Sequence, residues 1–170
     1  MINLNTSYPT VVHYDYIVDP SIMEHLIKKN DKKRNIVYYS YDDDFNMYHR
    51  FIQETTSMFL DLHGFKHNKE KWYMDVIRYQ LNNDTKRVKS GLAWHCENDN
   101  YPDVITVLMY LRIDQGINEG NLKYKDKNGN KIVLNIKSGT TVIMDGNVPH
   151  KPQDPYGTGK RDLIIMSFVK

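Results

Sequence analysis

The sequence predicts an α+β fold, mainly β, in a single domain that spans residues 1–170. Two helical patterns occupy the first part, residues 1–70, and about eight short β-type runs follow in residues 71–170. Turn-forming residues separate most of these runs. Two helices followed by many short strands indicate a barrel or sandwich of strands, supported by the N-terminal helices.

The first helical pattern begins at Asp19, a capping residue, and Pro20 follows at the first helical position. Its apolar stripe consists of Ile22, Met23, Leu26 and Ile27. The second pattern follows the acidic run 42–44, which suits a helix N-terminus. Apolar residues recur at helical spacing from Phe45 to Leu62, and Gly64 is expected to end this helix.

The β-type runs are rich in β-branched and aromatic residues. We expect them at Val11–Val18, Asn35–Ser40, Tyr73–Leu81, Gly91–Glu97, Val104–Ile113, Asn121–Lys127, Lys131–Ile136, Thr140–Asp145, Val148–Lys151 and Arg161–Val169. Turns are expected at 82–84, 128–129, 138–139 and 145–146. Asn128-Gly129 is the strongest hairpin signal, because both residues tolerate the positive φ of a type I′ turn.

The composition is that of an ordinary globular protein, with 40% hydrophobic and 26% charged residues. A net charge of +2 argues against nucleic-acid binding held mainly by bulk charge. The single Cys96 excludes an internal disulfide framework and a Cys-rich zinc site. Because no apolar run approaches the roughly 20 residues of a membrane span and no secretory signal is visible, we expect a soluble, intracellular, cytoplasmic protein.

Most of the seven histidines fit structural positions. His25 and His49 lie in helical patterns, where surface or packing roles are expected. His63 and His67 have the four-residue spacing of a metal site on a helix, but Gly64 interrupts that helix and no third ligand is near. We therefore expect no metal site there.

His95 and Glu97 differ from the others because residues i and i+2 of a strand project to the same face. A second strand-borne histidine, His150, follows later in the chain. Two histidines and one carboxylate form the facial triad that binds non-heme Fe(II) and leaves coordination positions open. Cys96 would lie on the opposite strand face as a packed thiol.

Arg161 opens the last β-type run. An arginine inside a barrel is costly unless it meets an anion, and its planar guanidinium suits a carboxylate. The segment 154–160, which ends at Lys160, is expected to loop out. Lys160 therefore competes with Arg161 as the residue that pairs with the anion.

The ordered set Trp94-His95-Cys96-Glu97, His150 and Arg161 resembles the His-x-Asp/Glu…His…Arg pattern of the Fe(II)/2-oxoglutarate-dependent oxygenases. Further segments resemble the prolyl-hydroxylase-like branch, and together they cover roughly residues 73–170. Val104–Leu111 resembles the strand after the first ligand pair, Glu119–Tyr124 resembles the "GG-x-L-x-aromatic" strand, and Gly139–Asp145 resembles the strand leading to the second histidine.

The resemblance implies a double-stranded β-helix (jelly-roll) core in residues 71–170. It also implies Fe(II) bound by His95, Glu97 and His150, and 2-oxoglutarate paired with Arg161. Tyr79 and Tyr110 match tyrosines whose phenols could hydrogen-bond this co-substrate. Glu97 replaces the commoner Asp of the family. Asp99 would project from the same face of the strand as His95 and Glu97, so it remains an alternative metal ligand.

The implied reaction couples oxidative decarboxylation of 2-oxoglutarate, giving succinate and CO2, to hydroxylation of a substrate by O2, with ascorbate as an optional reductant. A protein or peptide side chain is the leading substrate, and a small molecule is an alternative. AlkB-like nucleic-acid dealkylation is a further alternative, weakened because Ser167 stands where AlkB relatives carry a second arginine. A non-catalytic metal-binding jelly-roll module is the alternative from another class.

Overall fold

The computed structural model describes residues 2–4, 10–27, 34–41, 46–84, 88, 92–101 and 103–170. The helical elements are η1 (Pro20–Ile22), α1 (Met23–Leu26), α2 (Met47–Leu62) and η2 (Glu97–Asp99). The strands are β1 (Ile2–Leu4), β2 (Thr10–His13), β3 (Arg34–Ser40), β4 (Trp72–Asp84), β5 (Val104–Ile113), β6 (Ile117–Asn118), β7 (Leu122–Lys125), β8 (Lys131–Leu134), β9 (Thr140–Asp145), β10 (His150–Pro152) and β11 (Tyr156–Val169).

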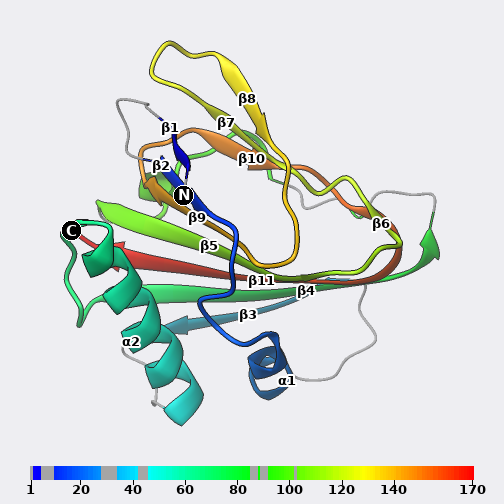
Figure 1. Cartoon of the computed structure of the whole chain (residues 1–170), viewed down its shortest axis with the longest axis horizontal. Coiled ribbons are helices and arrows are strands. Elements are labelled where there is room, and N and C mark those ends of the chain that lie inside the picture. The colour runs from blue at the N-terminus through cyan, green and yellow to red at the C-terminus, as the bar shows by residue number, and fades with distance from the viewer. Residues whose placement is uncertain are drawn as a thin grey trace.

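These elements form three layers (Figure 1). The helices α1 and α2 cover one face of a large sheet with the strand order β1-β2-β9-β5-β11-β4-β3, in which β6 also pairs with β11. A small sheet, β10-β7-β8, lies over the other face. Every strand pair is antiparallel. The predicted class, a mainly β fold with supporting N-terminal helices, is confirmed, and β1 to β3 extend the sheet into the first 70 residues.

Both helical patterns begin with side-chain caps. The Asp19 side chain accepts a hydrogen bond from the backbone N–H of Ser21, with Pro20 following as predicted. The α2 helix begins later than its apolar pattern suggested, because the Asn46 side chain caps it and accepts from two backbone N–H groups. The acidic run 42–44 and Phe45 lie outside the described residues. The helix ends at Leu62, and Gly64 follows with a φ of 75°.

Strand alternation divides the apolar side chains into two cores, one on each face of the large sheet. Met74 and Val76 of β4 face the helices and pack with Ile52 and Leu60 of α2. The alternate β4 residues Ile77 and Tyr79 face the small sheet. This second core also contains Leu108, Tyr110, Leu122, Tyr124, Val142, Val148 and Leu163. The space between the two sheets is therefore where side chains of distant strands converge.

The predicted loop at 154–160 is wrong, because β11 begins at Tyr156 and pairs with β4 and β6 through this segment. A bulge interrupts the ladder between Gly157 and Gly159, whose φ values are 114° and 123°. A β-carbon at Gly159 would approach that of Asp114 to 2.6 Å. The glycines therefore let the extra residues remain in the sheet.

The predicted strand Gly91–Glu97 is also wrong. Within its described part, 92–97, His95 alone pairs, through an isolated bridge to His150, and Glu97 begins the 3₁₀ helix η2. The reason is local: the Asp99 carboxylate accepts a hydrogen bond from the Cys96 backbone N–H at 2.8 Å, which closes a turn in place of a strand. Gly91 lies outside the described residues.

Two other local predictions need correction. The expected turn at 82–84 is part of β4, which continues to Asp84, and the run Val11–Val18 forms a strand only as far as His13. The β7–β8 hairpin forms at the predicted place, but Gly129 has a positive φ and Asn128 does not, so the turn is not type I′. Within the described ranges, none of the helices is both long and apolar enough to cross a membrane.

Candidate active site

His95 and His150 face each other across their bridge. The backbone N–H of His95 donates to the carbonyl of His150 at 3.1 Å, and the reciprocal bond is 2.9 Å. Residues paired in this way project their side chains to the same side. The two imidazole rings lie 4.3 Å apart between centroids, with a tilt of 56°.

Each imidazole is oriented by the backbone carbonyl two residues before it. His95 Nδ1 lies 3.0 Å from the carbonyl oxygen of Ala93, and His150 Nδ1 lies 2.9 Å from that of Val148. Because a carbonyl oxygen only accepts, each Nδ1 must carry a hydrogen. Each Nε2 is thereby left to face Glu97, the arrangement typical of metal-binding histidines.

Glu97 reaches the two histidines from the first residue of η2. Its Oε1 lies 3.2 Å from His150 Nε2 and 3.7 Å from His95 Nε2, and the residue is 8% exposed. Burial alone would raise the pKa of this carboxyl, but hydrogen bonds with His150 and His95 outweigh it and lower the pKa to about 2. The pKa of His95 is raised, chiefly by its hydrogen bond to Glu97. The pocket therefore favours a cation, either a proton or a metal ion, between the carboxylate and the rings.

The geometry of these three residues fits a metal ion. One potential ligand atom from each of His95, Glu97 and His150 lies within 4.8 Å of the others. Asp99 is exposed and its carboxylate caps the turn at Cys96, so the structure does not bring it to this group. The Cys96 thiol points elsewhere and donates to the carbonyl of Asn147 at 3.4 Å. Two neutral imidazoles and a carboxylate suit a divalent metal such as Fe(II).

Arg161 lies on the face of β11 toward the small sheet and is 1% exposed. Its Nη2 donates to the carbonyl of Gly120 at 2.8 Å, while its Nε has no hydrogen-bond partner. No carboxylate of the described residues forms an ion pair with Arg161. Lys160, one position before, donates its backbone N–H to Asp114 at 2.8 Å and does not line the pocket of Arg161. Because burying a cation is costly unless an anion compensates its charge, Arg161 is a candidate for binding an anionic ligand.

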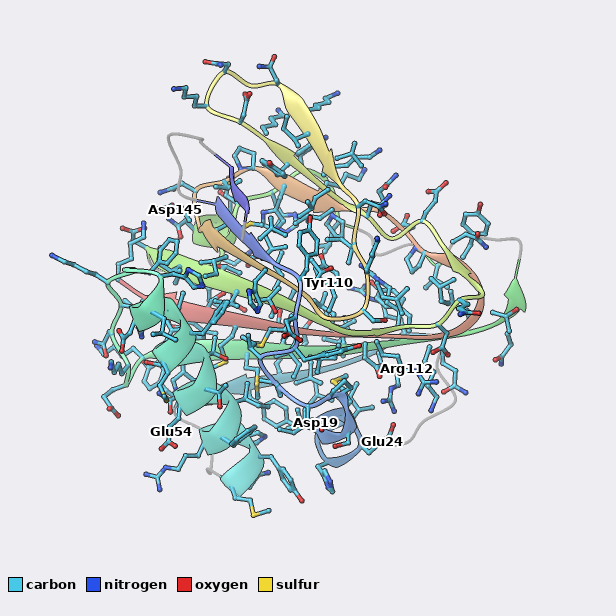
Figure 2. All side chains as sticks on the ribbon, viewed as in Figure 1. Asp19, Glu24, Glu54, Tyr110, Arg112 and Asp145 are labelled. Carbon is cyan, nitrogen blue, oxygen red and sulfur yellow. The ribbon has the colours of Figure 1, made fainter. Side chains whose placement is uncertain are left out.

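Tyr79 and Tyr110 flank Arg161. The centroid of each ring lies 5.3 Å from the guanidinium carbon, at a distance suited to cation–π contact. Tyr79 pairs directly with Arg161 across the β4–β11 ladder, and Figure 2 places Tyr110 between the two sheets. One pocket is lined by all six of the residues singled out by sequence: Tyr79, His95, Glu97, Tyr110, His150 and Arg161.

Sequence comparison finds no protein-family model that matches this chain and no curated protein that is significantly similar to it. Structural comparison does find similar proteins. A 2OG-Fe(II) oxygenase family oxidoreductase from Burkholderia pseudomallei matches with a TM-score of 0.68 at 12% identity, covering 94% of this chain and 84% of that one.

This chain has the fold of the 2OG-Fe(II) oxygenases. Two other similar structures are prolyl hydroxylases. One, from Trichoplax adhaerens in complex with a hypoxia-inducible factor peptide fragment, matches with a TM-score of 0.61 at 11% identity and covers 94% of this chain and 83% of its own. The other, a viral collagen prolyl hydroxylase from Paramecium bursaria Chlorella virus-1 in a 2OG complex, has a TM-score of 0.51 at 15% identity and covers 99% and 98%.

Sequence reasoning missed several residues that this oxygenase fold brings to the site. Arg34 of β3 lies opposite Tyr79 and lines the same pocket as Arg161. Asp75, Tyr38 and Tyr101 line a neighbouring cavity that shares His95 and Glu97. Strand alternation could have suggested Asp75, because it is a charged residue on the same face of an apolar run as Tyr79. Nothing in the sequence indicated that β3 pairs with β4, so Arg34 and Tyr38 could not have been predicted.

A larger hollow, of about 760 Å³, lies beside α2 and is lined by residues such as Asn46, Ser57 and Trp72. It contains none of the six predicted site residues. We therefore base the functional assignment on the smaller pockets, which contain those residues, and not on the size of this hollow.

Proposed function

We propose that this protein is an Fe(II)- and 2-oxoglutarate-dependent dioxygenase that hydroxylates a protein or peptide side chain. One observation carries the proposal: the His95–Glu97–His150 group opens onto the same pocket as Arg161, a buried cation without an ion-pair partner among the described residues. A dicarboxylate that chelates a metal through its keto-acid end needs this combination of a metal site and a cationic site.

In this proposal the two facing sheets are the two sides of a double-stranded β-helix, and residues 1–170 form one oxygenase domain. His95, Glu97 and His150 hold Fe(II), and Arg161 pairs with the distal carboxylate of 2-oxoglutarate. The hydroxyl groups of Tyr79 and Tyr110 are available for hydrogen bonds to that carboxylate. The pocket that these residues line is narrow, with a volume of about 30 Å³.

The chemistry is that of the metal and co-substrate: O2 and 2-oxoglutarate yield succinate and CO2, and one oxygen atom converts a substrate C–H bond into C–OH. The chain contributes by orienting the side chains that would hold the metal and the co-substrate. The carbonyls of Ala93 and Val148 hold both imidazoles with Nε2 toward the metal position. Gly120 holds the guanidinium of Arg161 through its carbonyl oxygen.

A peptide substrate is favoured by the two prolyl hydroxylases among the structural neighbours, one of which was solved with a peptide. The AlkB-like alternative gains no support from position 167. Ser167 is 2% exposed and its hydroxyl lies 3.1 Å from that of Thr106, so a neutral packing residue stands where AlkB relatives carry arginine.

The test is succinate formation from 2-oxoglutarate with Fe(II) and ascorbate, measured by mass spectrometry with and without a peptide library. We expect the wild type to form succinate and His150→Ala to lose both turnover and high-affinity metal binding while keeping its circular dichroism spectrum. His25→Ala, which removes an exposed histidine, serves as the matched control and should behave as the wild type. A wild type that binds neither metal nor 2-oxoglutarate would overturn the proposal in favour of a non-catalytic module.

A further inference from the structure

A second cavity, of about 430 Å³, adjoins the candidate metal centre. His95 and Glu97 form part of its lining, and strands β3, β4 and β11 supply the opposite wall. Its volume lies in the range that binds small ligands or single side chains. A substrate group in this cavity would lie beside the metal position.

Asp75 gives this cavity an acidic wall. It projects from the same face of β4 as Ile77 and Tyr79, and its side chain is half-buried. Its carboxylate has no hydrogen bond or ion pair with any described residue. Burial first, and the charge of Glu97 second, raise the pKa of Asp75 to about 6, as expected for a carboxylate without a compensating partner. A bound cation would supply that partner.

Tyrosine rings surround this carboxylate. Tyr38 lies directly opposite Asp75 across the β3–β4 pair and is 65% exposed, so the cavity opens to solvent at this point. Tyr101 stacks on Tyr73 with 4.4 Å between ring centroids. Tyr101 is held next to the metal centre because its backbone N–H donates to the carbonyl of Glu97 at 3.1 Å. Aromatic faces attract cations, particularly those that leave water.

The sheet face beneath the metal centre is therefore polarised. Arg34, Tyr79 and Arg161 align across β3, β4 and β11 at one end, and Tyr38, Asp75 and Ile165 align across the same strands at the other. Asp75 and Tyr79, which mark the two ends on β4, are four positions apart, or roughly 13 Å. The first end attracts a dicarboxylate and the second repels it, so the two ends select ligands of opposite charge.

We propose that Asp75, together with Tyr38 and Tyr101, binds an alkylammonium group of the substrate, such as the side chain of lysine. The inference rests on the proposed oxygenase function and specifies its substrate class. The ammonium group pairs with Asp75 and contacts the rings, while a methylene group of the same side chain lies at the metal centre. The reaction converts that C–H into C–OH and consumes O2 and 2-oxoglutarate, releasing succinate and CO2.

The test measures binding without turnover. The protein is loaded with Mn(II) and 2-oxoglutarate without oxygen, at pH 8, and titrated calorimetrically with short Gly/Ser peptides that differ at one central residue: lysine, norleucine, proline or glutamate. We expect the lysine peptide to bind roughly 10–30-fold more tightly than the norleucine peptide. A parallel titration with free lysine distinguishes a peptide substrate from an amino acid, and tight binding of either supports the proposal.

Variants assign that preference to Asp75. Asp75→Asn, which keeps the shape and removes the charge, should abolish the preference for lysine over norleucine. Asp75→Lys should favour the glutamate peptide. Glu54→Gln, which removes an exposed carboxylate on α2, is the matched control and should keep the wild-type preference (Figure 2).

Two results would overturn the inference: equal binding of the norleucine or proline peptide by the wild type, or an unchanged lysine preference in Asp75→Asn. Failure of the oxygenase proposal itself is distinct, because the protein would then show no thermal stabilisation by Mn(II) and 2-oxoglutarate before any peptide is added. That result would overturn both proposals. Succinate formation without a lysine preference would overturn only the assignment of the substrate.

Discussion

The orientation of single side chains decides what this site can bind. His95 and His150 use their Nδ1 atoms on backbone carbonyls, which leaves Nε2 for a metal ion. Arg161 uses one nitrogen on the Gly120 carbonyl and keeps its Nε without a hydrogen bond. A β-carbon at Gly120 would lie 3.1 Å from that Nε, so glycine there lets the guanidinium lie against the backbone.

Arg161→Ala tests the residue-scale assignment. Removal of the buried guanidinium should raise the 2-oxoglutarate concentration needed for half-maximal succinate formation by roughly 30-fold or more, because a charged hydrogen-bonding partner is lost. Mn(II) binding, measured by calorimetry, should change little. Lys160→Ala is the matched control. If Lys160→Ala raises the requirement instead, the neighbouring lysine is the anion-binding residue.

At the scale of elements, β5 and β11 are joined next to the bulge at Gly157–Gly159. Asp114 accepts from Arg112 Nε at 2.7 Å and from the Lys160 backbone N–H at 2.8 Å. Its own N–H donates to the carbonyl of Lys160. These bonds secure the part of β11 immediately before Arg161.

Asp114→Asn should therefore destabilise the protein in a pH-dependent way. The hydrogen bond from Arg112 is the main cause that lowers the pKa of Asp114 below its usual 3.8. A lowered folded-state pKa contributes stability that is present above 3.8 and lost as pH falls through the folded value. The difference in urea midpoint between wild type and Asp114→Asn should shrink below pH 4, roughly where the carboxylate protonates. A difference that stays constant down to pH 2.5 would contradict this account.

Arg78 joins two strands of the large sheet through a buried ion pair and also contacts the helix layer. Arg78 of β4 contacts Asp162 of β11 through Nε and Nη2 at 2.8 and 2.9 Å, and its Nη2 also reaches Glu24 of α1 at 2.8 Å. Both Arg78 and Asp162 are buried. Removing one partner of such a pair leaves the other charge buried without compensation.

Arg78→Met should lower the free energy of unfolding by about 3–5 kcal/mol, measured by urea denaturation. The double variant Arg78→Met with Asp162→Leu should recover much of that loss, because neither charge remains buried. Arg50→Met, at an exposed ion pair on α2, should change stability by no more than about 1 kcal/mol. An additive double variant would mean that the two side chains act independently.

For the whole molecule, ligand binding between the sheets should appear as added stability, because it couples β4, β5, β7, β10 and β11. Mn(II) and 2-oxoglutarate at about 100 times their dissociation constants should each raise the free energy of unfolding by about 2.7 kcal/mol. For a chain of this size, each increment corresponds to a melting-temperature rise of roughly 5–10 °C. Differential scanning fluorimetry should show both increments in the wild type. Arg161→Ala should keep the metal increment and lose most of that of 2-oxoglutarate; loss of both would indicate a folding defect.

Local sequence patterns determined much of this protein. The bounds of β5 and β9 coincide with the predicted runs, the cap at Asp19 forms as expected, and the order of His95, Glu97, His150 and Arg161 led to the oxygenase fold. These features depend on residue type, alternation and spacing, which act over a few positions and can be read from one chain. The roles of the site residues in binding iron and 2-oxoglutarate stay predictions that the experiments above test.

Only the tertiary structure decided how distant segments meet. Strand parity was the wrong reason for placing His95 beside Glu97, because a turn capped by Asp99 carries Glu97 to the histidines. The pairing of β3 with β4 placed Tyr38 beside Asp75 and Arg34 beside Tyr79. Cross-strand neighbours depend on register between segments far apart in sequence, and no local propensity specifies that register. Two of the 13 tyrosines, Tyr38 and Tyr101, thus gained a place at the acidic cavity that their number alone could not reveal.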